Sequence, residues 1–342
     1  MPISIEFIFF LFSIFSKLSI DKYLLQLEDF NEKKEIKSTD QYRIYIAVSL
    51  ENTKTYVIKQ FYFHKAATIE TFQSVITQYS TLKNETIVPF IGFCSIEQTE
   101  TPVYSIITKY MEGSSLENLF ELVHQGNLPP FWNPTRNIIY LYGIIFGLNY
   151  LHQNNIIHQN LNLSNILLDE QGFPKISDFQ IPSLIPINTK DYPKSKLIFL
   201  APEVIGTNRY TFQSDIYSFG ILCIMLLSSD VNILEADIST HDLIDKIKHG
   251  ILSVLPENVP KFIHNLIFSC ISIDPSKRPP ASEILEKITE FIPEFVTHLK
   301  IDKEEFENYK DLLTGAEESF EEKVQEAKAA ADSGDAQAML QY

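Results

Sequence analysis

The stretch that decides the fold of this chain is "IIHQNLNLSNILLDEQGFPKISDFQ", residues 156–180. It has the spacing of a catalytic loop that is followed by a metal-binding turn. The polar side chains in its first half are mostly amides, and Asn160 stands near the centre of the loop. An ionised carboxylate can accept a proton, whereas a side-chain amide effectively cannot. The stretch therefore predicts the scaffold of a reactive loop without the group that would accept its proton.

The part of the chain before this stretch has the pattern of a small sheet. Residues 42–50, "YRIYIAVSL", and residues 54–63, "KTYVIKQFYF", run apolar and β-branched around the polar turn "ENTK". This pattern predicts an antiparallel hairpin. A helix is expected at residues 66–83, and two further strands are expected in "TIVPFIGFCSIE" and "PVYSIITKY". The first third is thus expected to be a sheet with one helix.

The part of the chain after residue 111 has helical periodicity. In "TRNIIYLYGIIFGLNYLHQ", residues 135–153, apolar side chains occur nearly all round the helix, which predicts burial. A second buried helix is expected in "SDIYSFGILCIMLLSS", with Ser214 or Asp215 as its N-cap. Later helices are expected at 242–249, 259–272 and 281–291. A sheet lobe followed by a helical lobe predicts an α+β fold with a cleft between the lobes.

Six motifs occur in one order along the chain: "YVIK", "IIHQNLNLSNILL", "DFQ", "APE", "SDIYSFG" and "DPSKRP". Through them the chain resembles a eukaryotic protein kinase domain, nearest the tyrosine-kinase-like group. The resemblance implies a bilobal protein-kinase-like fold over residues 27–297. Its N-terminal lobe would span about 27–110 and its C-terminal lobe about 111–297.

The resemblance also implies where a nucleotide would lie. The residues expected to line its site are Lys59, Val57, Thr108, Tyr110, Leu167 and Asp178. Three glycines normally cover the phosphates, and their positions hold Lys37, Thr39 and Tyr42, whose side chains obstruct a close approach. ATP and Mg²⁺ are therefore expected to bind weakly or not at all.

Lys59 corresponds to the lysine that normally pairs with a helix glutamate. Counting back along the chain places Val75 at the glutamate position, so Lys59 is expected to lack an orienting carboxylate. The alternative is an ordinary strand lysine whose ammonium group only reaches toward solvent.

The catalytic loop departs from the family pattern at three positions. His158 is retained and is expected to be structural. Gln159 stands for the arginine that docks an activation-loop phosphate, Asn160 for the proton-accepting aspartate, and Asn162 for the lysine or arginine that steadies the transferred phosphate. The resemblance therefore implies that the loop has lost both its base and a cation.

Both metal-ligand positions are retained, as Asn165 and Asp178. Their oxygens suit Mg²⁺, although such residues often only hydrogen-bond nearby backbone. Gln180 replaces the glycine of the metal turn and is expected to fix that turn. Lys196 lies where a threonine normally contacts the catalytic loop, and phosphate-driven activation lacks its arginine partner.

The retained residues are expected to hold the fold together. Glu203 and Arg278 would form a buried salt bridge, and Asp215 would cap and anchor the central helix. An aromatic column between the lobes would consist of Phe179, His158, Phe90 and Tyr79.

Composition limits the classes of partner. The net charge of −16 disfavours nucleic acid and anionic membranes, and three distant cysteines favour a reducing, cytoplasmic compartment. Residues 1–26 form an apolar leader, expected to be packed on the protein, to act as a signal or interfacial anchor, or to result from a mis-assigned start. Residues 298–342 form an acidic helical tail, and their end resembles the start of a Sel-type, tetratricopeptide-like repeat. A plain acidic amphipathic helix is the alternative for that end.

Two functional hypotheses follow. In the first, the chain is a pseudokinase that acts as a signalling scaffold or interaction module, binding other proteins through the helical lobe and the C-terminal repeats. In the second, it is a divergent active serine/threonine kinase that uses Lys59, Asn165 and Asp178, with Asn160 only orienting the substrate hydroxyl.

Overall fold

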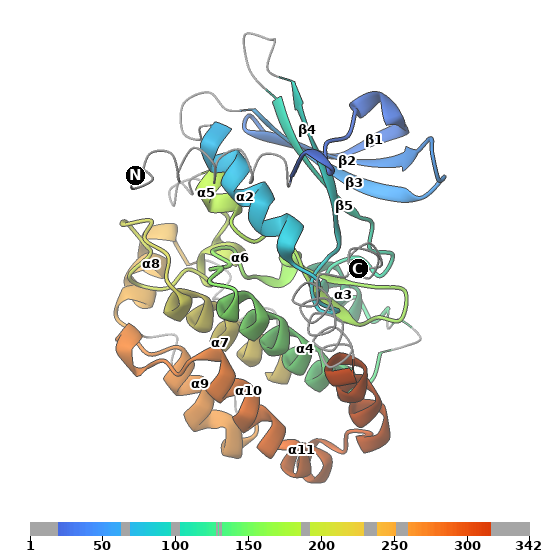
Figure 1. The fold of residues 1–342 in the computed structure, drawn as a ribbon. Helices are drawn as coiled ribbons and strands as arrows, with labels where there is room; N and C mark the ends of the chain where they lie inside the picture. The colour runs from blue at the N-terminus through green and yellow to red at the C-terminus, as the bar shows by residue number, and fades with distance from the viewer. Residues whose placement is uncertain are drawn as a thin grey trace, which may run out of the picture.

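The computed structural model shows a sheet lobe and a larger helical lobe, with helix α2 beside the sheet (Figure 1). This is the predicted bilobal α+β fold. The structure describes residues 20–62, 69–96, 103–127, 129, 132–185, 192–228, 238–250 and 259–315.

The described N-terminal lobe is built on an antiparallel sheet with the strand order β1-β2-β3-β5-β4. The strands are β1 (Phe30–Ser38), β2 (Tyr42–Ser49), β3 (Thr55–Tyr62), β4 (Phe90–Ile96) and β5 (Val103–Lys109). The register of β2 with β3 runs from Tyr42↔Phe61 to Val48↔Thr55, which confirms the predicted hairpin. Tyr56 and Ile58 of β3 are buried, as expected of alternate residues on the core face of a strand.

Helix α2 (Ile69–Thr81) lies against the sheet and is amphipathic. Its buried residues, Phe72, Val75, Ile76 and Tyr79, recur at three- and four-residue spacing and face the core. Val75 therefore serves as an apolar core residue of this helix.

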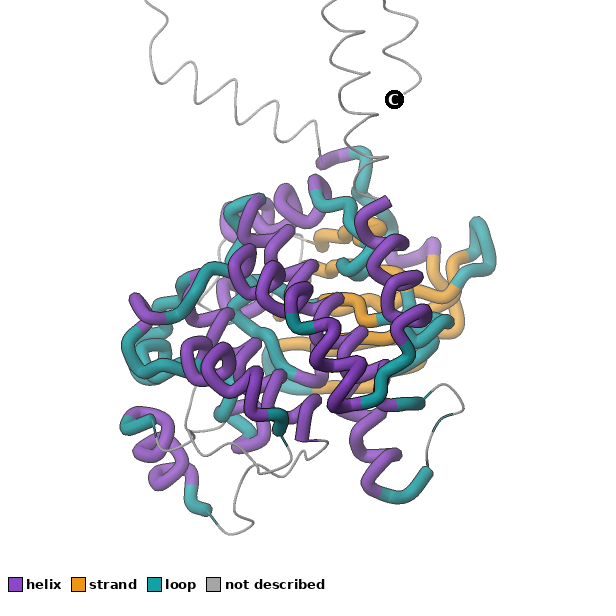
Figure 2. The backbone as a smooth tube through the Cα atoms, turned by 90° about the horizontal axis from the view of Figure 1, so that it is seen from below, coloured by secondary structure: helices purple, strands orange, loops and turns teal. Residues whose placement is uncertain are grey.

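The helical lobe is organised around α4 (Pro134–Gln153) and α7 (Phe212–Ser228), which are buried nearly all round as their sequences predict. Asn133 caps α4, because its side chain accepts the backbone N–H of Arg136 at 3.1 Å. Seen from below, the helices of this lobe lie in front of the strands (Figure 2). The other elements are α3 (Leu116–His124), η2 (Leu163–Asn165), β6 (Ile166–Leu168), β7 (Pro174–Ile176), α5 (Ile181–Leu184), α6 (Lys194–Leu197), α8 (Thr240–Lys248), η4 (Lys261–Ile263), α9 (His264–Cys270), η5 (Pro275–Lys277), α10 (Ala281–Glu290) and α11 (Ile292–Leu299).

The predicted N-cap of α7 is wrong. The side chain of Thr211 accepts the backbone N–H of Ser214 at 3.2 Å, and Ser214 Oγ in turn accepts the N–H of Thr211 at 3.0 Å. The helix therefore begins earlier than the sequence indicated, at Phe212. Asp215 lies in the first turn, where its carboxylate points to the catalytic loop instead of capping the helix.

The chain before the first strand packs on the sheet. Residues 20–26 run beside β4, where the N–H of Leu25 donates to the carbonyl of Phe93 at 2.9 Å. A short helix, η1 (Leu27–Asp29), then leads into β1. Residues 1–19 of the predicted apolar leader, which spans residues 1–26, lie outside the described residues. No helix of the described part of the chain is both long and apolar enough to span a membrane.

The fold continues beyond the predicted boundary at residue 297. Residues 303–315 are helical and bury Phe306, Tyr309 and Leu313 against the helical lobe. Tyr309 stacks on Phe173 with ring centroids 4.6 Å apart, and Arg136 pairs with Glu305 at 2.8 Å. The first part of the acidic tail thus has a core-facing side. The predicted Sel-type segment lies outside the described residues.

Candidate functional site

A cavity of about 320 Å³ lies between the two lobes. Its size is within the range of small-ligand pockets, roughly 300–1,000 Å³. The six residues expected to line a nucleotide site all line this one cavity: Val57 and Lys59 on β3, Thr108 on β5, Tyr110 after it, Leu167 on β6 and Asp178 after β7. The fold therefore brings together residues that lie more than a hundred positions apart in the sequence.

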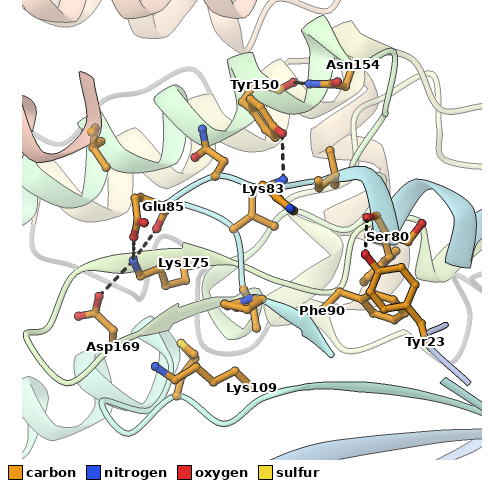
Figure 3. Close-up of a pocket in the computed structure, with 18 of the residues that line it drawn as sticks. Tyr23, Ser80, Lys83, Glu85, Phe90, Lys109, Tyr150, Asn154, Asp169 and Lys175 are labelled. Atoms are coloured by element: carbon orange, nitrogen blue, oxygen red, sulfur yellow. Dashed lines mark hydrogen bonds and ion pairs between the residues drawn. The ribbon is translucent and has the colours of Figure 1, made fainter. Parts of the chain in front are cut away.

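A second hollow, of about 990 Å³, lies between α2, α4 and the β6–β7 hairpin (Figure 3). Three of its charged groups pair with one another, because Lys175 lies 3.2 Å from Asp169 and 3.6 Å from Glu85. The hydroxyl of Tyr150 accepts the backbone N–H of Lys83 beside them. The motif residues of the catalytic loop do not line this hollow, so the cavity between the lobes is the candidate site.

Lys59 has a carboxylate partner, contrary to the expectation from the sequence. Its ammonium group forms a salt bridge with Asp178, and its side chain is only 12% exposed. A strand lysine that merely reaches solvent is therefore ruled out. Val75, at the position of the usual helix glutamate, is buried and apolar, and the fold supplies the carboxylate from the metal turn, 119 residues after Lys59.

The two potential metal ligands lie at the same end of the β6–β7 hairpin. The N–H of Ser177, the residue before Asp178, donates to the carbonyl of Asn165 at 2.9 Å. The side-chain NH₂ of Asn165 donates to the carbonyl of Asn160 at 2.7 Å. Asn165 Oδ1 accepts only a long contact from Ser164 Oγ, at 3.5 Å, so it is the atom that could bind a cation. One carboxylate and one amide oxygen fit Mg²⁺ that is also held by phosphate oxygens. Within the described residues no cluster of three His, Cys, Asp or Glu side chains could hold a metal by itself.

The amide of Asn160 stands where the resemblance places a catalytic base. Its Oδ1 accepts hydrogen bonds from the NH₂ of Asn162 at 3.2 Å and from the hydroxyl of Tyr192 at 3.3 Å. Burial raises the pKa of Tyr192 to about 12, so this hydroxyl remains protonated at neutral pH. The amide oxygen is thus already engaged by two donors of the chain itself.

Gln159 takes part in a neutral contact at the position expected to dock a phosphate. The hydroxyl of Ser183, on α5, donates to Gln159 Oε1 at 2.8 Å. An uncharged side chain that already binds its neighbour offers no charge partner for a phosphorylated activation segment.

Asp215 anchors the catalytic loop through hydrogen bonds to its backbone. It is 1% exposed and accepts the backbone N–H groups of His158 at 2.7 Å and Gln159 at 2.9 Å, while Nε2 of His152 lies 3.0 Å away. His158 Nδ1 accepts the N–H of Asn160 at 3.2 Å, and burial lowers the pKa of His158. The neutral His158 therefore bonds backbone, in the structural position expected for it.

The expected aromatic column is present between the lobes. Tyr79 stacks on Phe179 with ring centroids 3.9 Å apart, Phe90 lies 5.8 Å from Tyr79, and His158 lies 6.4 Å from Phe179. The hydroxyl of Tyr79 also donates to the carbonyl of Phe179 at 2.8 Å. This column joins α2 to the metal turn and to the catalytic loop.

The turn after Phe179 is fixed by Gln180. Its backbone is left-handed, with φ of 59°, the conformation that a glycine would adopt without strain. Its side-chain NH₂ donates to Oε1 of Gln78 on α2 at 2.6 Å, and its N–H donates to the carbonyl of His158 at 2.8 Å. The glutamine accepts the unusual backbone conformation and connects α2 to the turn.

Two substitutions at Gln180 should therefore have different effects. Gln180→Ala keeps the left-handed strain and loses the bond to Gln78, so the free energy of unfolding should fall by about 1–2 kcal/mol. Gln180→Gly loses the same bond but relieves the strain, so its net change should be within about 0.5 kcal/mol. Equilibrium urea unfolding of both variants measures the difference. Equal losses in the two variants would contradict this account of the turn.

The expected salt bridge between Glu203 and Arg278 is present and bidentate. The two guanidinium nitrogens lie 2.7 and 2.9 Å from the carboxylate oxygens, and the Arg278 side chain is 0% exposed. The remaining donors bind the carbonyls of Ser272 and Gln213, each at 2.8 Å. The pair connects the end of the activation segment to the helical lobe.

Comparison with known proteins agrees with this architecture. The family model described as "Protein tyrosine and serine/threonine kinase" matches residues 34–288, well over half of the chain. The chain therefore belongs to the protein kinase family. Its curated relatives include tyrosine-kinase-like serine/threonine kinases, as the motifs indicated.

Among these relatives, a Raf homolog serine/threonine-protein kinase of Caenorhabditis elegans is 34% identical over 209 residues, covering 56% of this chain and 25% of the relative. The probable serine/threonine-protein kinase PBL7 of Arabidopsis thaliana is 31% identical, covering 54% of this chain and 50% of the relative. Mitogen-activated protein kinase kinase kinase 9 of the same plant is 31% identical, covering 51% of this chain and 23% of the relative. The chain thus spans at most half the length of these three relatives.

Besides the pairing of Lys59 with Asp178 and the contact of Ser183 with Gln159, three more contacts of the site were not foreseen from the sequence. They are the hydroxyl of Tyr192 on Asn160, the side chain of Gln78 on Gln180, and the ammonium group of Lys196 on Ser164. Each joins residues at least 32 positions apart. No local motif marks such a pair, although the unusual residues Gln180 and Lys196 were visible in the sequence.

Proposed function

We propose that this domain is a pseudokinase that acts as a signalling scaffold or interaction module. The proposal rests chiefly on Asn160. An amide stands at the proton-accepting position, and its oxygen already accepts hydrogen bonds from Asn162 and Tyr192. A substrate hydroxyl that approached this oxygen would have to displace Tyr192 and would still meet no group able to take its proton.

The missing base and the missing cation of the catalytic loop each lower the rate of phosphate transfer, and the two reductions multiply. Removing a positioned base lowers a rate by about 10² to 10⁴-fold. Asn162 also supplies no positive charge for the transferred phosphate, and its side chain instead bonds Asn160 and Ser164. Electrostatic stabilisers of a transition state contribute separately from the base, so both losses must be overcome together.

Weak nucleotide binding is consistent with the same cavity. Asp178 is engaged by Lys59, and a metal ion would have to share this carboxylate. Lys37, Thr39 and Tyr42 carry side chains at positions where backbone would otherwise approach the phosphates. Thr39 Oγ1 accepts the N–H of Tyr42 at 3.1 Å, so this turn is closed by its own contacts.

The scaffold role is supported by what the fold retains. Bidentate Glu203–Arg278 and buried Asp215 stabilise the helical lobe independently of catalysis. That lobe exposes Phe268 (39%) and Ile273 (48%), which other proteins could cover. A cytoplasmic location is supported by the three cysteines, which are free and buried.

Restoring the base alone should not restore catalysis. Asn160→Asp should give no measurable transfer of phosphate from ATP, because Asn162 and the side chains over the phosphates remain. A radiolabelled transfer assay with a generic protein substrate measures this, and the triple variant with Asn162→Lys and Gln180→Gly is the comparison. Turnover by Asn160→Asp alone at the ~1–100 s⁻¹ of ordinary kinases would contradict the proposal and favour the active-kinase alternative.

A further inference from the structure

A lysine of the activation segment contacts a residue that lines the cavity between the lobes. Lys196 lies on α6, which Figure 1 shows between the two lobes. Its ammonium group donates to Oγ of Ser164 at 2.7 Å. Ser164 lines the same cavity as Lys59 and Asp178. The cation is therefore brought to the phosphate end of the candidate nucleotide site.

Lys196 is also joined to the position where the loop has lost its own cation. Ser164 Oγ accepts the hydrogen bond from Lys196 and donates to Oδ1 of Asn162 at 2.6 Å. Asn162 is the residue that replaces a lysine or arginine. The positive charge of Lys196 thus lies one side chain, that of Ser164, away from Asn162, the position where the family pattern has a cation. Lys196 belongs to the activation segment and not to the catalytic loop.

The surroundings of Lys196 favour an anion. Among the described residues, Ser164 is the only hydrogen-bond partner of the Lys196 ammonium group, which forms no salt bridge with any of them. Burial and the nearby cations Lys37 and Lys59 lower the pKa of Lys196, whereas Glu117 and Asp178 raise it. Lys59 already engages the carboxylate of Asp178. Three lysines therefore share a region with two carboxylates, one of them already paired with Lys59, and a phosphate group would relieve the repulsion among the lysines.

We propose that Lys196 binds the terminal phosphate of a nucleoside triphosphate in this cavity, in place of the cation that Asn162 does not provide. A lysine suits this role, since its ammonium group is a point charge with three donors, of which Ser164 uses one. The inference concerns binding and not transfer, so it is independent of whether Asn160 supports catalysis. The inference also gives Lys37 a second role. Its side chain was expected to obstruct the phosphates, and its positive charge would attract them.

The test compares nucleotides that differ in their phosphates. Calorimetry measures the equilibrium dissociation constants of ATP, ADP and adenosine from the protein, all in the presence of Mg²⁺. The proteins compared are the unaltered chain, Lys196→Met, Lys196→Arg and Lys194→Met. Lys194 is the matched control, because it lies on the same helix but donates to the carbonyl of Ile238. Thermal unfolding without nucleotide checks that each variant is folded.

The unaltered chain should prefer ATP over ADP by about tenfold or more, as expected for one charge-assisted contact. Lys196→Met should weaken the binding of ATP by about tenfold and the binding of ADP by less than about twofold. Lys196→Arg and Lys194→Met should keep the preference for ATP over ADP. Equal weakening of ATP and ADP, unchanged ATP binding, or no nucleotide binding by the unaltered chain would each overturn the inference. If Lys196→Met does not fold, an ATP preference below about twofold in the unaltered chain also overturns it. Phosphate transfer is not measured here, so this failure and that of the proposed function are distinguishable.

Discussion

Replacing Arg278 by Ala should lower the free energy of unfolding by about 3–5 kcal/mol, the usual loss when one partner of a buried ion pair is removed. The substitution leaves the Glu203 carboxylate without its bidentate partner and leaves the carbonyls of Ser272 and Gln213 without donors. For a domain of this size, the midpoint of thermal unfolding should fall by roughly 10 °C. Differential scanning calorimetry and urea unfolding measure the two quantities.

Two further variants separate charge from geometry at this position. Arg278→Lys keeps the positive charge but cannot form the two parallel bonds to Glu203, so it should recover only part of the loss. Glu203→Gln should be milder than Arg278→Ala, because the Glu203 side chain is 26% exposed and water can replace some of its contacts. A loss below about 1 kcal/mol in Arg278→Ala would show that the pair adds little to stability.

Replacing Asp215 by Asn should have the second large effect. The carboxylate accepts the N–H groups of both His158 and Gln159 and contacts His152, so an amide must present its NH₂ to at least one donor. Hydrogen bonds to a charged group contribute about 1.5–3 kcal/mol each, and the expected loss of unfolding free energy is about 3 kcal/mol. Hydrogen exchange at the amides of residues 158 and 159 should accelerate more than exchange in the core of α4.

The matched control for Asp215 is Asp245→Asn on α8. Asp245 is exposed and pairs with the equally exposed His249. This control should change the free energy of unfolding by less than about 0.5 kcal/mol. If Asp215→Asn is as mild as the control, the catalytic loop is held by other contacts.

The fold could be predicted from the sequence where the signals are local. The β2–β3 hairpin follows from two apolar, β-branched runs around a polar turn, and α4 follows from a long helical run that ends near Gln153. The N-cap of α7 was misplaced because Thr211, Ser214 and Asp215 are all suitable capping residues in a row of five. Only the hydrogen bonds between Thr211 and Ser214 distinguish among them.

The site could be predicted only as a set of positions. Motif order placed Lys59 and Asp178 correctly in one cavity, yet their salt bridge was missed because the partner was sought on α2. The contact of Tyr192 with Asn160 depends on how the activation segment folds back over the loop. Such contacts arise from tertiary packing, which periodicity and spacing do not report.

The central claim is that the amide of Asn160 leaves this kinase-family domain unable to transfer phosphate. The most direct test incubates the purified, unaltered chain with Mg²⁺ and ATP labelled in its terminal phosphate, beside an Asp178→Asn control. The account predicts that label in the unaltered chain, and in a generic protein substrate, does not exceed label in the control. Incorporation by the unaltered chain that disappears in the Asp178→Asn control would contradict it.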